Sequence, residues 1–237
     1  MQMVPTNKKK SIAAAVLGWV LCSAALAEPG VNANEIVLGQ AAGFTGSVAG
    51  TVKELTAGAK AYFDRVNAAG GINGRKITLI SLDDGYSPPK TVEQVRRLVE
   101  QDEVLALFQT LGTPCNSAIH KYVNAKKVPH LLLATGATKW GDPKNYPWTI
   151  GFNLSYQSEG AIYAKWLLKN KPNAKIGILS QNDDYAKDVL KGVKDGLGTA
   201  GAKMIVKEAT YEVSDPTVDS QILTLQGSGA DTFINIT

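Results

Sequence analysis

The stretch AYFDRVNAAGGINGRKITLISL, residues 61–82, decides the fold class of this chain. It opens within an amphipathic helix, which we predict from about Val52 to Ala69. Gly70-Gly71 ends the helix, because glycine readily adopts the left-handed conformation of a helix C-terminus. The run from Lys76 to Leu82 is apolar and rich in β-branched residues, which is typical of a buried strand. The predicted apolar side of the helix consists of Leu55, Ala59, Tyr62, Phe63 and Val66.

The same alternation continues in both directions along the chain. Strands separated by helices indicate parallel sheets with helices on both faces, which is an α/β fold. An extended segment rich in aromatics and proline, residues 146–151, interrupts the alternation, and we interpret it as a crossing between two lobes. The predicted lobes are residues 28–150 and 151–237. The further predicted strands are 35–39, 104–108, 128–133, 175–180, 203–206 and 232–236.

The first 27 residues have the pattern of a secretory signal peptide. Lys8–Lys10 are followed by an apolar run from Ile12 to Leu21 and then by Ala25-Leu26-Ala27. We expect cleavage after Ala27 and a periplasmic location. A membrane anchor is the alternative, but the run is shorter than the roughly 20 apolar residues that span a bilayer. A lipoprotein site at Cys22 is a third possibility, although Leu21 stands where a small residue is usual.

Composition excludes several classes of protein. The chain has 25 basic and 21 acidic residues, and three of the lysines lie in the predicted leader, so the remainder has 22 basic and 21 acidic residues. These charges are interspersed, which argues against nucleic acid as a partner. Cys115 is the one cysteine beyond the leader, so no intrachain disulfide can form there. We expect a small, partly buried thiol rather than a nucleophile.

Ligands of open parallel sheets bind beyond the carboxyl ends of the strands, where helices begin. The predicted strand ends carry hydroxyls, glycines and few charges. Hydroxyls beside a helix N-terminus suit a carboxylate, whereas an exposed carbonyl such as that of Gly136 suits an ammonium group. The alternative is that Thr113 and Thr138 only cap helices. For the acidic pairs Asp83-Asp84 and Asp183-Asp184 we favour capping and turn formation.

The sequence shows no catalytic, metal-binding or cofactor-binding constellation. The sequence contains neither a glycine-rich dinucleotide fingerprint after the first strand nor a phosphate-binding P-loop. A nucleophile elbow is also missing. His120 and His130 have no companions at ligand spacing, which makes zinc chemistry an unfavourable hypothesis. We therefore predict no enzyme activity, no metal and no cofactor.

With these motifs placed, the chain resembles the type I periplasmic binding proteins of branched-chain amino-acid-type ABC transporters. The resemblance runs from Glu35 to the last residue. The ordered set of motifs is more specific than any one of them. It consists of Ala61–Asn67, Gly70–Arg75, Leu111–Pro114, Ala134–Thr138 and Asn182–Tyr185.

The resemblance implies a two-lobed carrier that closes by a hinge motion around a small ligand and is recognised by a membrane permease. It implies that Thr113, with Leu111 and Gly112 in the same loop, and Thr138 hold a ligand carboxylate. The Gly136 carbonyl, next to Ala137, would help to hold an ammonium group. Tyr185 would close over the ligand, and Phe44 would contact its side chain. Ala186 departs from the glycine that many relatives have after the aspartate–tyrosine pair.

The resemblance also implies that relatives continue beyond Thr237, where their acidic partner for the ligand ammonium often lies. We therefore expect a truncated second lobe, weak ligand binding and unpaired sheet edges. The leading hypothesis is a monomeric carrier that delivers an amino acid to the permease of an ABC transporter. The alternatives are a carrier for an aromatic or aliphatic acid, amide or urea, a ligand-sensing module, and an α/β enzyme.

Overall fold

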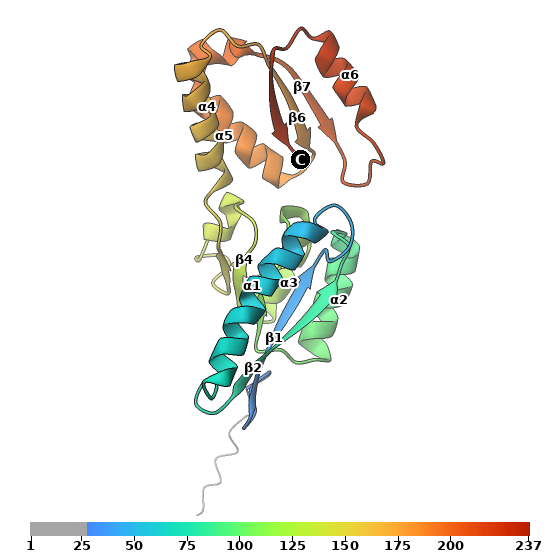
Figure 1. Ribbon diagram of the computed structural model, residues 1–237, viewed down its shortest axis with the longest axis vertical. Helices are drawn as coiled ribbons and strands as arrows, with labels where there is room; N and C mark the ends of the chain where they lie inside the picture. Colours follow the sequence, from blue (N-terminus) through green and yellow to red (C-terminus); the bar gives the residue numbers. More distant parts are fainter. Residues whose placement is uncertain (1–27) are drawn as a thin grey trace, which may run out of the picture.

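The structure is a computed structural model, and it describes residues 28–237. The predicted leader, residues 1–27, lies outside the described residues. The chain folds into two lobes that are stacked along the long axis of the molecule, each with its own sheet (Figure 1). The predicted α/β class with parallel sheets flanked by helices is confirmed.

The first lobe contains a five-stranded sheet in the order β2-β1-β3-β4-β5, with every pairing parallel. Its core joins the sheet to α2 and α3 through buried side chains such as Ala41, Leu98 and Ile119. The elements are β1 (Glu35–Ala42), α1 (Ala49–Ala68), β2 (Lys76–Asp83), α2 (Pro88–Glu100), β3 (Ala106–Phe108), α3 (Thr113–Ala125), β4 (His130–Leu133), η1 (Thr138–Gly141) and β5 (Thr149–Gly151).

Helix α1 follows the predicted span closely, but the predicted apolar side is wrong at one position. Tyr62 is 62% exposed, whereas Val52 and Thr56 are buried. The buried side therefore lies about 100° away from Tyr62 on the helix, toward Phe63, whose ring packs 5.4 Å from that of Phe108. Tyr62 is accordingly a surface residue of the first lobe.

The segment predicted as the crossing between lobes is partly a strand. Thr149–Gly151 forms β5, the edge strand of the first sheet, and pairs with β4. Its three residues are too few to show a periodicity in the sequence. The connection between the two sheets runs instead through residues 152–155, after which α4 begins at Tyr156.

The second lobe contains a three-stranded parallel sheet in the order β7-β6-β8. β6 is buried along its whole length, and its Ile176 and Ile178 pack with α4 and α5 in one core. β8 is an edge strand, and Phe233 on it is 53% exposed. The elements are α4 (Tyr156–Asn170), β6 (Ile176–Gln181), α5 (Asp184–Gly201), η2 (Ala202–Met204), β7 (Ile205–Tyr211), α6 (Asp219–Gly227) and β8 (Thr232–Ile236).

Helices α4 and α5 cross at glycines, which lets their backbones come unusually close. A Cβ atom on Gly160 would lie 2.1 Å from the carbonyl oxygen of Val189. A Cβ atom on Gly192 would lie 2.0 Å from the carbonyl oxygen of Gln157. Only glycine fits at either position, so this crossing fixes how the two helices sit beside the second sheet.

Both histidines are buried in the first lobe. His130 Nε2 lies 2.6 Å from the Thr110 hydroxyl. His120 stacks on the ring of Tyr146 at 3.8 Å between centroids and meets the Trp140 ring edge-on at 5.0 Å. Burial lowers the pKa of His120 to about 4 and that of His130 to about 3, so both side chains are neutral in the folded protein near neutral pH.

This burial predicts a loss of stability in mild acid. Below the ordinary histidine pKa of about 6.5, both histidines bind a proton in the unfolded chain, whereas in the folded chain they stay neutral until the pH reaches about 4 or lower. The free energy of unfolding should therefore fall as pH decreases, with a slope approaching about 2.7 kcal/mol per pH unit near pH 5. Denaturant unfolding between pH 7 and 5 measures this slope. His120→Phe keeps the stacking and should halve the slope; an unchanged slope would contradict the assignment.

Candidate functional site

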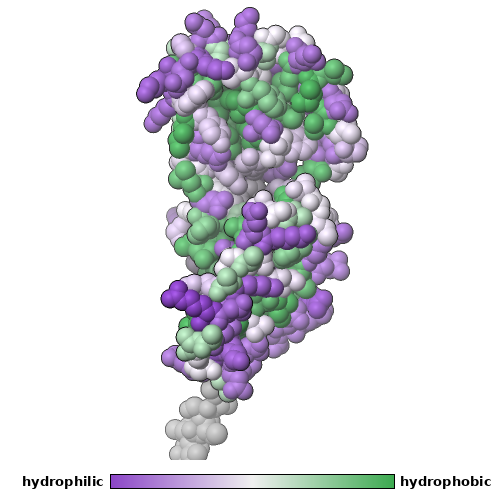
Figure 2. Space-filling model, in the orientation of Figure 1, coloured by the Kyte–Doolittle hydropathy of each residue, from purple (hydrophilic) through white to green (hydrophobic). Residues whose placement is uncertain are grey.

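A cavity of about 540 Å³ lies between the two lobes, at the carboxyl ends of strands from both sheets. The narrow waist where the lobes meet is visible in the space-filling view (Figure 2). Both sheets contribute loops to this cavity, which is the position expected for ligands of parallel sheets. Its lining residues are Ser47, Val48, Thr51, Tyr86, Leu111, Gly112, Thr113, Ala134, Asn153, Tyr156, Glu159, Gln181, Tyr185, Tyr211 and Thr237.

The wall from the first lobe is built around the start of α3. Thr113 is the first residue of this helix and is only 2% exposed. Its hydroxyl lies 2.6 Å from that of Thr135, which ties the loop after β3 to the loop after β4. Gly112 precedes it with a φ of 96°, and a Cβ atom there would lie 2.3 Å from the ring of Tyr86. Glycine at this position therefore lets the tyrosine ring lie against the loop.

The wall from the second lobe is aromatic. The rings of Tyr156 and Tyr185 meet edge-to-face with centroids 4.7 Å apart. Gln181, at the end of β6, accepts a hydrogen bond from the Tyr211 hydroxyl at 3.3 Å and donates to Asp183 Oδ2 at 2.8 Å. Its amide also reaches across the cavity to the hydroxyl of Tyr86 at 3.5 Å. The two lobes thus share one polar network inside the cavity.

Three tyrosines of the cavity, Tyr86, Tyr185 and Tyr211, are neutral hydrogen-bond donors at ordinary pH. Burial raises the pKa of Tyr86 and of Tyr185 well above the usual value, and it also raises that of Tyr211. Burial likewise raises the pKa of the Asp183 carboxyl, whose oxygens bond Gln181 and the backbone of Ala186. The arrangement can therefore offer phenol hydroxyls and ring faces to a small molecule.

The structure brings four of the predicted ligand residues to this cavity: Leu111, Gly112, Thr113 and Tyr185. Phe44 is not among the lining residues and packs against the buried cluster of Ala42, Val52 and Leu111. The other three predicted residues, Gly136, Ala137 and Thr138, line a separate hollow of about 270 Å³, which Trp140 and Ile150 also line.

The polar groups predicted for ligand binding in this second hollow make contacts within the protein. The Gly136 carbonyl accepts a hydrogen bond from the backbone N–H of Tyr156 at 2.9 Å, at the start of α4. The backbone N–H of Thr138 donates to Asp188 Oδ2 at 2.7 Å, and its hydroxyl donates to the same oxygen at 2.9 Å. Because Asp188 belongs to α5, Thr138 joins the first lobe to the second.

A second bond strengthens this junction. Lys139 Nζ lies 2.8 Å from Asp184 Oδ2, one helical turn before Asp188 on α5. We call these contacts of Thr138 and Lys139 with α5 the inter-lobe latch. Gln157 Nε2 also donates to Asp188 Oδ1 at 2.8 Å, so the aspartate is held from both sides. The latch fixes the spacing of the lobes beside the cavity.

Removing the latch should open the lobes. We expect Asp188→Ala to remove charge-assisted hydrogen bonds that contribute about 1.5–3 kcal/mol each, and so to shift the population toward longer inter-lobe distances. Spin labels at Lys53→Cys on α1 and Lys165→Cys on α4, both exposed, measure the distance by pulsed electron paramagnetic resonance. Asp195→Ala, on the same helix, should leave the distribution unchanged. An unaltered distribution in Asp188→Ala would show that the latch does not hold the lobes.

The structure shows which of the threonines and aspartates at the strand ends cap a helix. Neither Thr113 nor Thr138 caps its helix through its side chain. Asp183 is the N-cap of α5 and accepts from the Ala186 N–H, which confirms capping for this residue, whereas Asp184 pairs with Lys139. Asp84 accepts from the backbone N–H of Tyr86 at 2.8 Å and from the Thr91 hydroxyl at 2.9 Å, which confirms a turn role.

Several cavity residues were missed at the level of sequence. Tyr86 lies in the loop after β2 and Tyr211 is the last residue of β7, and this position at a strand end could have pointed to both. Tyr156 and Glu159 lie in the first turn of α4, and nothing in the sequence around them indicated that this turn faces a cavity. Cys115, which was expected to be partly buried, is fully buried in α3, and burial raises the pKa of its thiol to about 12, which suits a packing role.

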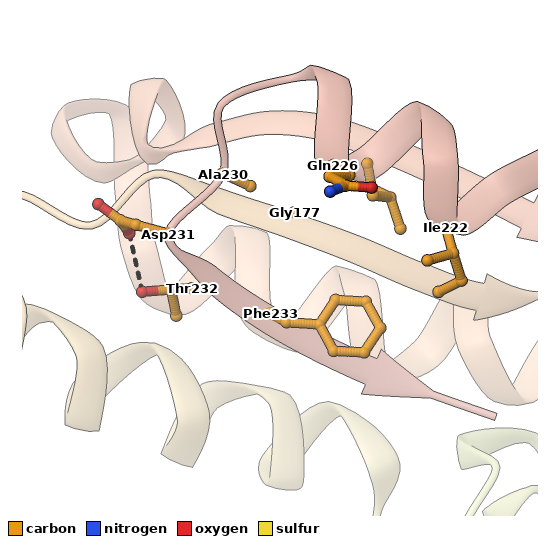
Figure 3. Close-up of a pocket in the computed structure, with 8 residues that line it drawn as sticks. Gly177, Ile222, Gln226, Ala230, Asp231, Thr232 and Phe233 are labelled. Carbon is orange, nitrogen blue, oxygen red and sulfur yellow. Dashed lines mark hydrogen bonds between the residues drawn. The ribbon is translucent and has the colours of Figure 1, made fainter.

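Another hollow, of about 370 Å³, lies on the second lobe between α6 and β8 (Figure 3). Apolar side chains such as Ile222 and Phe233 line it, and Figure 2 shows hydrophobic surface on this lobe. Its one charged side chain, Asp231, is bonded to the Thr232 hydroxyl and to the Lys175 N–H. Without convergent free polar groups, this hollow is a weaker candidate for a small polar ligand than the inter-lobe cavity.

Two further properties concern residues 28–237. Within that range no helix has the length and apolar character needed to cross a bilayer. The same residues contain no cluster of three or more histidine, cysteine, aspartate or glutamate side chains placed to hold a metal ion.

Residues 35–237 match the periplasmic binding protein family, and the chain belongs to that family. It is 26% identical over 180 residues to an amino acid binding protein of Pseudomonas aeruginosa, covering 75% of this chain and 46% of the relative. It is 24% identical over 207 residues to a Leu/Ile/Val-binding protein homolog of Brucella suis, covering 84% and 51%.

The fold agrees with that of a solved type I relative. The structure of a fatty acid ABC transporter substrate-binding protein from Thermomonospora curvata superposes with a TM-score of 0.75 at 26% identity. The match covers 87% of this chain and 52% of that one. The chain therefore spans about half the length of the relatives it matches.

Proposed function

We propose that this protein is the periplasmic solute-binding component of an ABC transporter, which captures a small ligand in the inter-lobe cavity and presents it to a membrane permease. The observation that carries the proposal is the cavity itself, since loops from two parallel sheets meet there with hydroxyl, amide and aromatic groups. Such a site suits capture by hinge closure, because a ligand that contacts both lobes favours the closed state. A periplasmic location, a monomeric state and the absence of catalysis belong to the same proposal.

An amino acid is the ligand we propose first. The α3 N-terminus with Thr113 offers polar contacts for a carboxylate, and the tyrosines offer apolar surface for a side chain. The relatives from Pseudomonas and Brucella carry amino-acid names, which supports this choice. The relative from Thermomonospora is named for fatty acids, so a carrier for a carboxylic acid without an amine is the second candidate.

Calorimetric titration of the full chain with leucine, phenylalanine, benzoate and octanoate tests the proposal. We expect one of these ligand types to bind, and Tyr185→Ala to weaken its binding at least about tenfold, or roughly 1.4 kcal/mol. Tyr62→Ala removes an exposed tyrosine from the first lobe and should bind as the wild type does. Absence of binding to all four probes, or equal binding by Tyr185→Ala, would count against the proposal.

A further inference from the structure

A fully buried carboxyl group lies behind the cavity wall, and the proposed function does not use it. Asp84 directly follows β2 and is 0% exposed, and none of the salt bridges formed within residues 28–237 involves it. Burial of such a group costs free energy unless hydrogen bonds satisfy it. Asp84 accepts one bond from the Thr91 hydroxyl at 2.9 Å and one from the backbone N–H of Tyr86 at 2.8 Å. The second bond connects the buried group to a residue that lines the cavity.

The backbone of Tyr86 is strained. It lies in a turn that begins at Asp84, where the Ser87 N–H donates to the Asp84 carbonyl at 3.0 Å. Both central residues of this turn have positive φ angles, 57° at Gly85 and 60° at Tyr86. Glycine adopts this left-handed conformation freely, whereas a bulky aromatic residue keeps it only where its surroundings hold it there. The bond from the Tyr86 N–H to the Asp84 side chain is one such restraint.

Two glycines from neighbouring loops make room for the same tyrosine. A Cβ atom on Gly112 would lie 2.3 Å from the Tyr86 ring, and one on Gly43 would lie 3.0 Å from the Tyr86 backbone nitrogen. Gly43 follows β1 and Gly112 follows β3, so three loops of the first lobe converge on this one side chain. Because strain persists where the surrounding structure demands a particular geometry, this convergence points to a role for the exact placement of Tyr86.

The placement brings the Tyr86 hydroxyl to the second lobe. Gln181 Nε2, at the end of β6, donates to this hydroxyl over a long distance of 3.5 Å. Gln181 is itself buried, and its amide is fixed by bonds with Asp183 and Tyr211. Tyr86 therefore joins the two walls of the cavity, whereas the inter-lobe latch joins the lobes beside it.

We propose that Asp84 is a positioning residue of the inter-lobe cavity, which holds the Tyr86 backbone in its left-handed conformation and so sets the Tyr86 ring across the cavity toward Gln181. Asp84 is not among the lining residues, so it acts through Tyr86 and not on the ligand. Thr91 holds the second oxygen of the carboxyl group and belongs to the same arrangement. The proposal rests on the proposed function, because it takes the wall that contains Tyr86 to contact the ligand.

Nuclear magnetic resonance of the ligand-free full chain with carbon-13-labelled tyrosine tests the positioning without a ligand. Tyr86→Phe identifies the Tyr86 ring signal by removing it. Asp84→Ala should move this signal toward that of a free tyrosine and leave the Tyr62 signal in place. Asp84→Asn keeps an oxygen for the Tyr86 N–H and should restore the wild-type signal, while Thr91→Val should give a smaller shift. Asp142→Ala removes the aspartate of another turn in the first lobe and should leave the Tyr86 signal unchanged.

Ligand affinity tests whether Asp84 acts through Tyr86. Calorimetry uses whichever of leucine, phenylalanine, benzoate and octanoate binds the wild type. We expect Asp84→Ala and Tyr86→Ala each to weaken binding about tenfold, and the double variant to bind no more weakly than Tyr86→Ala, since effects that share one route do not add. A loss of about 100-fold in the double variant would show two independent routes and overturn the proposal.

The ligand-free measurement keeps the two proposals separate. An unshifted Tyr86 signal in Asp84→Ala overturns the positioning, and if that variant does not fold, an unshifted signal in Thr91→Val does so. If none of the four probes binds the wild type, the proposed function fails, and the Tyr86 ring signal still decides whether Asp84 positions the tyrosine.

Discussion

Replacing Gly192 by alanine should lower the free energy of unfolding by about 3 kcal/mol. The added Cβ atom would lie 2.0 Å from the carbonyl oxygen of Gln157 and 2.8 Å from its Cα. Because both atoms belong to the backbone of α4, no side chain can move aside to relieve the contact. The two helices must separate, and the core of the second lobe loses packing. Denaturant unfolding followed by circular dichroism measures the loss.

Gly58→Ala is the matched control. Gly58 also lies within a helix, α1, but no atom comes within 4 Å of a Cβ atom built on it. Alanine there should raise the free energy of unfolding by about 0.5–1 kcal/mol, through lower entropy of the unfolded chain. Equal stability of the two variants would show that the close crossing of α4 and α5 does not exist in solution.

Gly112→Ala should weaken ligand binding by displacing a tyrosine of the cavity wall. The residue has a φ of 96°, which costs alanine about 1–3 kcal/mol of backbone strain. Its Cβ atom would also lie 2.3 Å from the ring of Tyr86, which must then leave its place in the cavity wall. We expect ligand affinity to fall at least about tenfold, measured by calorimetry with the probe that the wild type binds most tightly.

The control for this variant separates backbone strain from displacement of the ring. Gly46 also has a positive φ, of 82°, but the nearest atom to its Cβ would be the Gly85 carbonyl oxygen at 3.7 Å. Gly46→Ala should therefore lose stability and keep its ligand affinity. If Gly112→Ala and Gly46→Ala bind ligand equally well, Tyr86 does not contribute to the site.

The elements of the fold could be predicted because their signals are local. The alternation of apolar runs with amphipathic stretches gives the helices and most strands, and Gly70-Gly71 marks the end of α1 as predicted. One exception is β5, whose three residues gain their strand conformation from pairing with β4 and not from their own pattern. The residues of β5 alone therefore do not reveal that they pair with β4. The other exception is the strand predicted over 203–206, since residues 202–204 form η2 and β7 runs from Ile205 to Tyr211.

The site was harder to predict because it depends on how the lobes meet. Tyr86 and Gln181 are 95 positions apart, and only the closeness of the lobes brings their side chains together. Thr138 has the same type of side chain and loop position as Thr113, yet its hydroxyl bonds Asp188 of the other lobe. Which of two similar threonines faces the cavity follows from the orientation of each loop, which residue type alone does not specify.

The central claim is that the ligand binds between the lobes, and nuclear magnetic resonance of a full chain with carbon-13-labelled tyrosine tests it most directly. Addition of an amino acid that binds the protein should shift the ring signals of the four cavity tyrosines, which are Tyr86, Tyr156, Tyr185 and Tyr211. The ring signals of Tyr62 and Tyr146, which do not line the cavity, should stay in place. Shifts confined to Tyr62 or Tyr146, or unchanged signals from all four cavity tyrosines at saturating ligand, would contradict the claim.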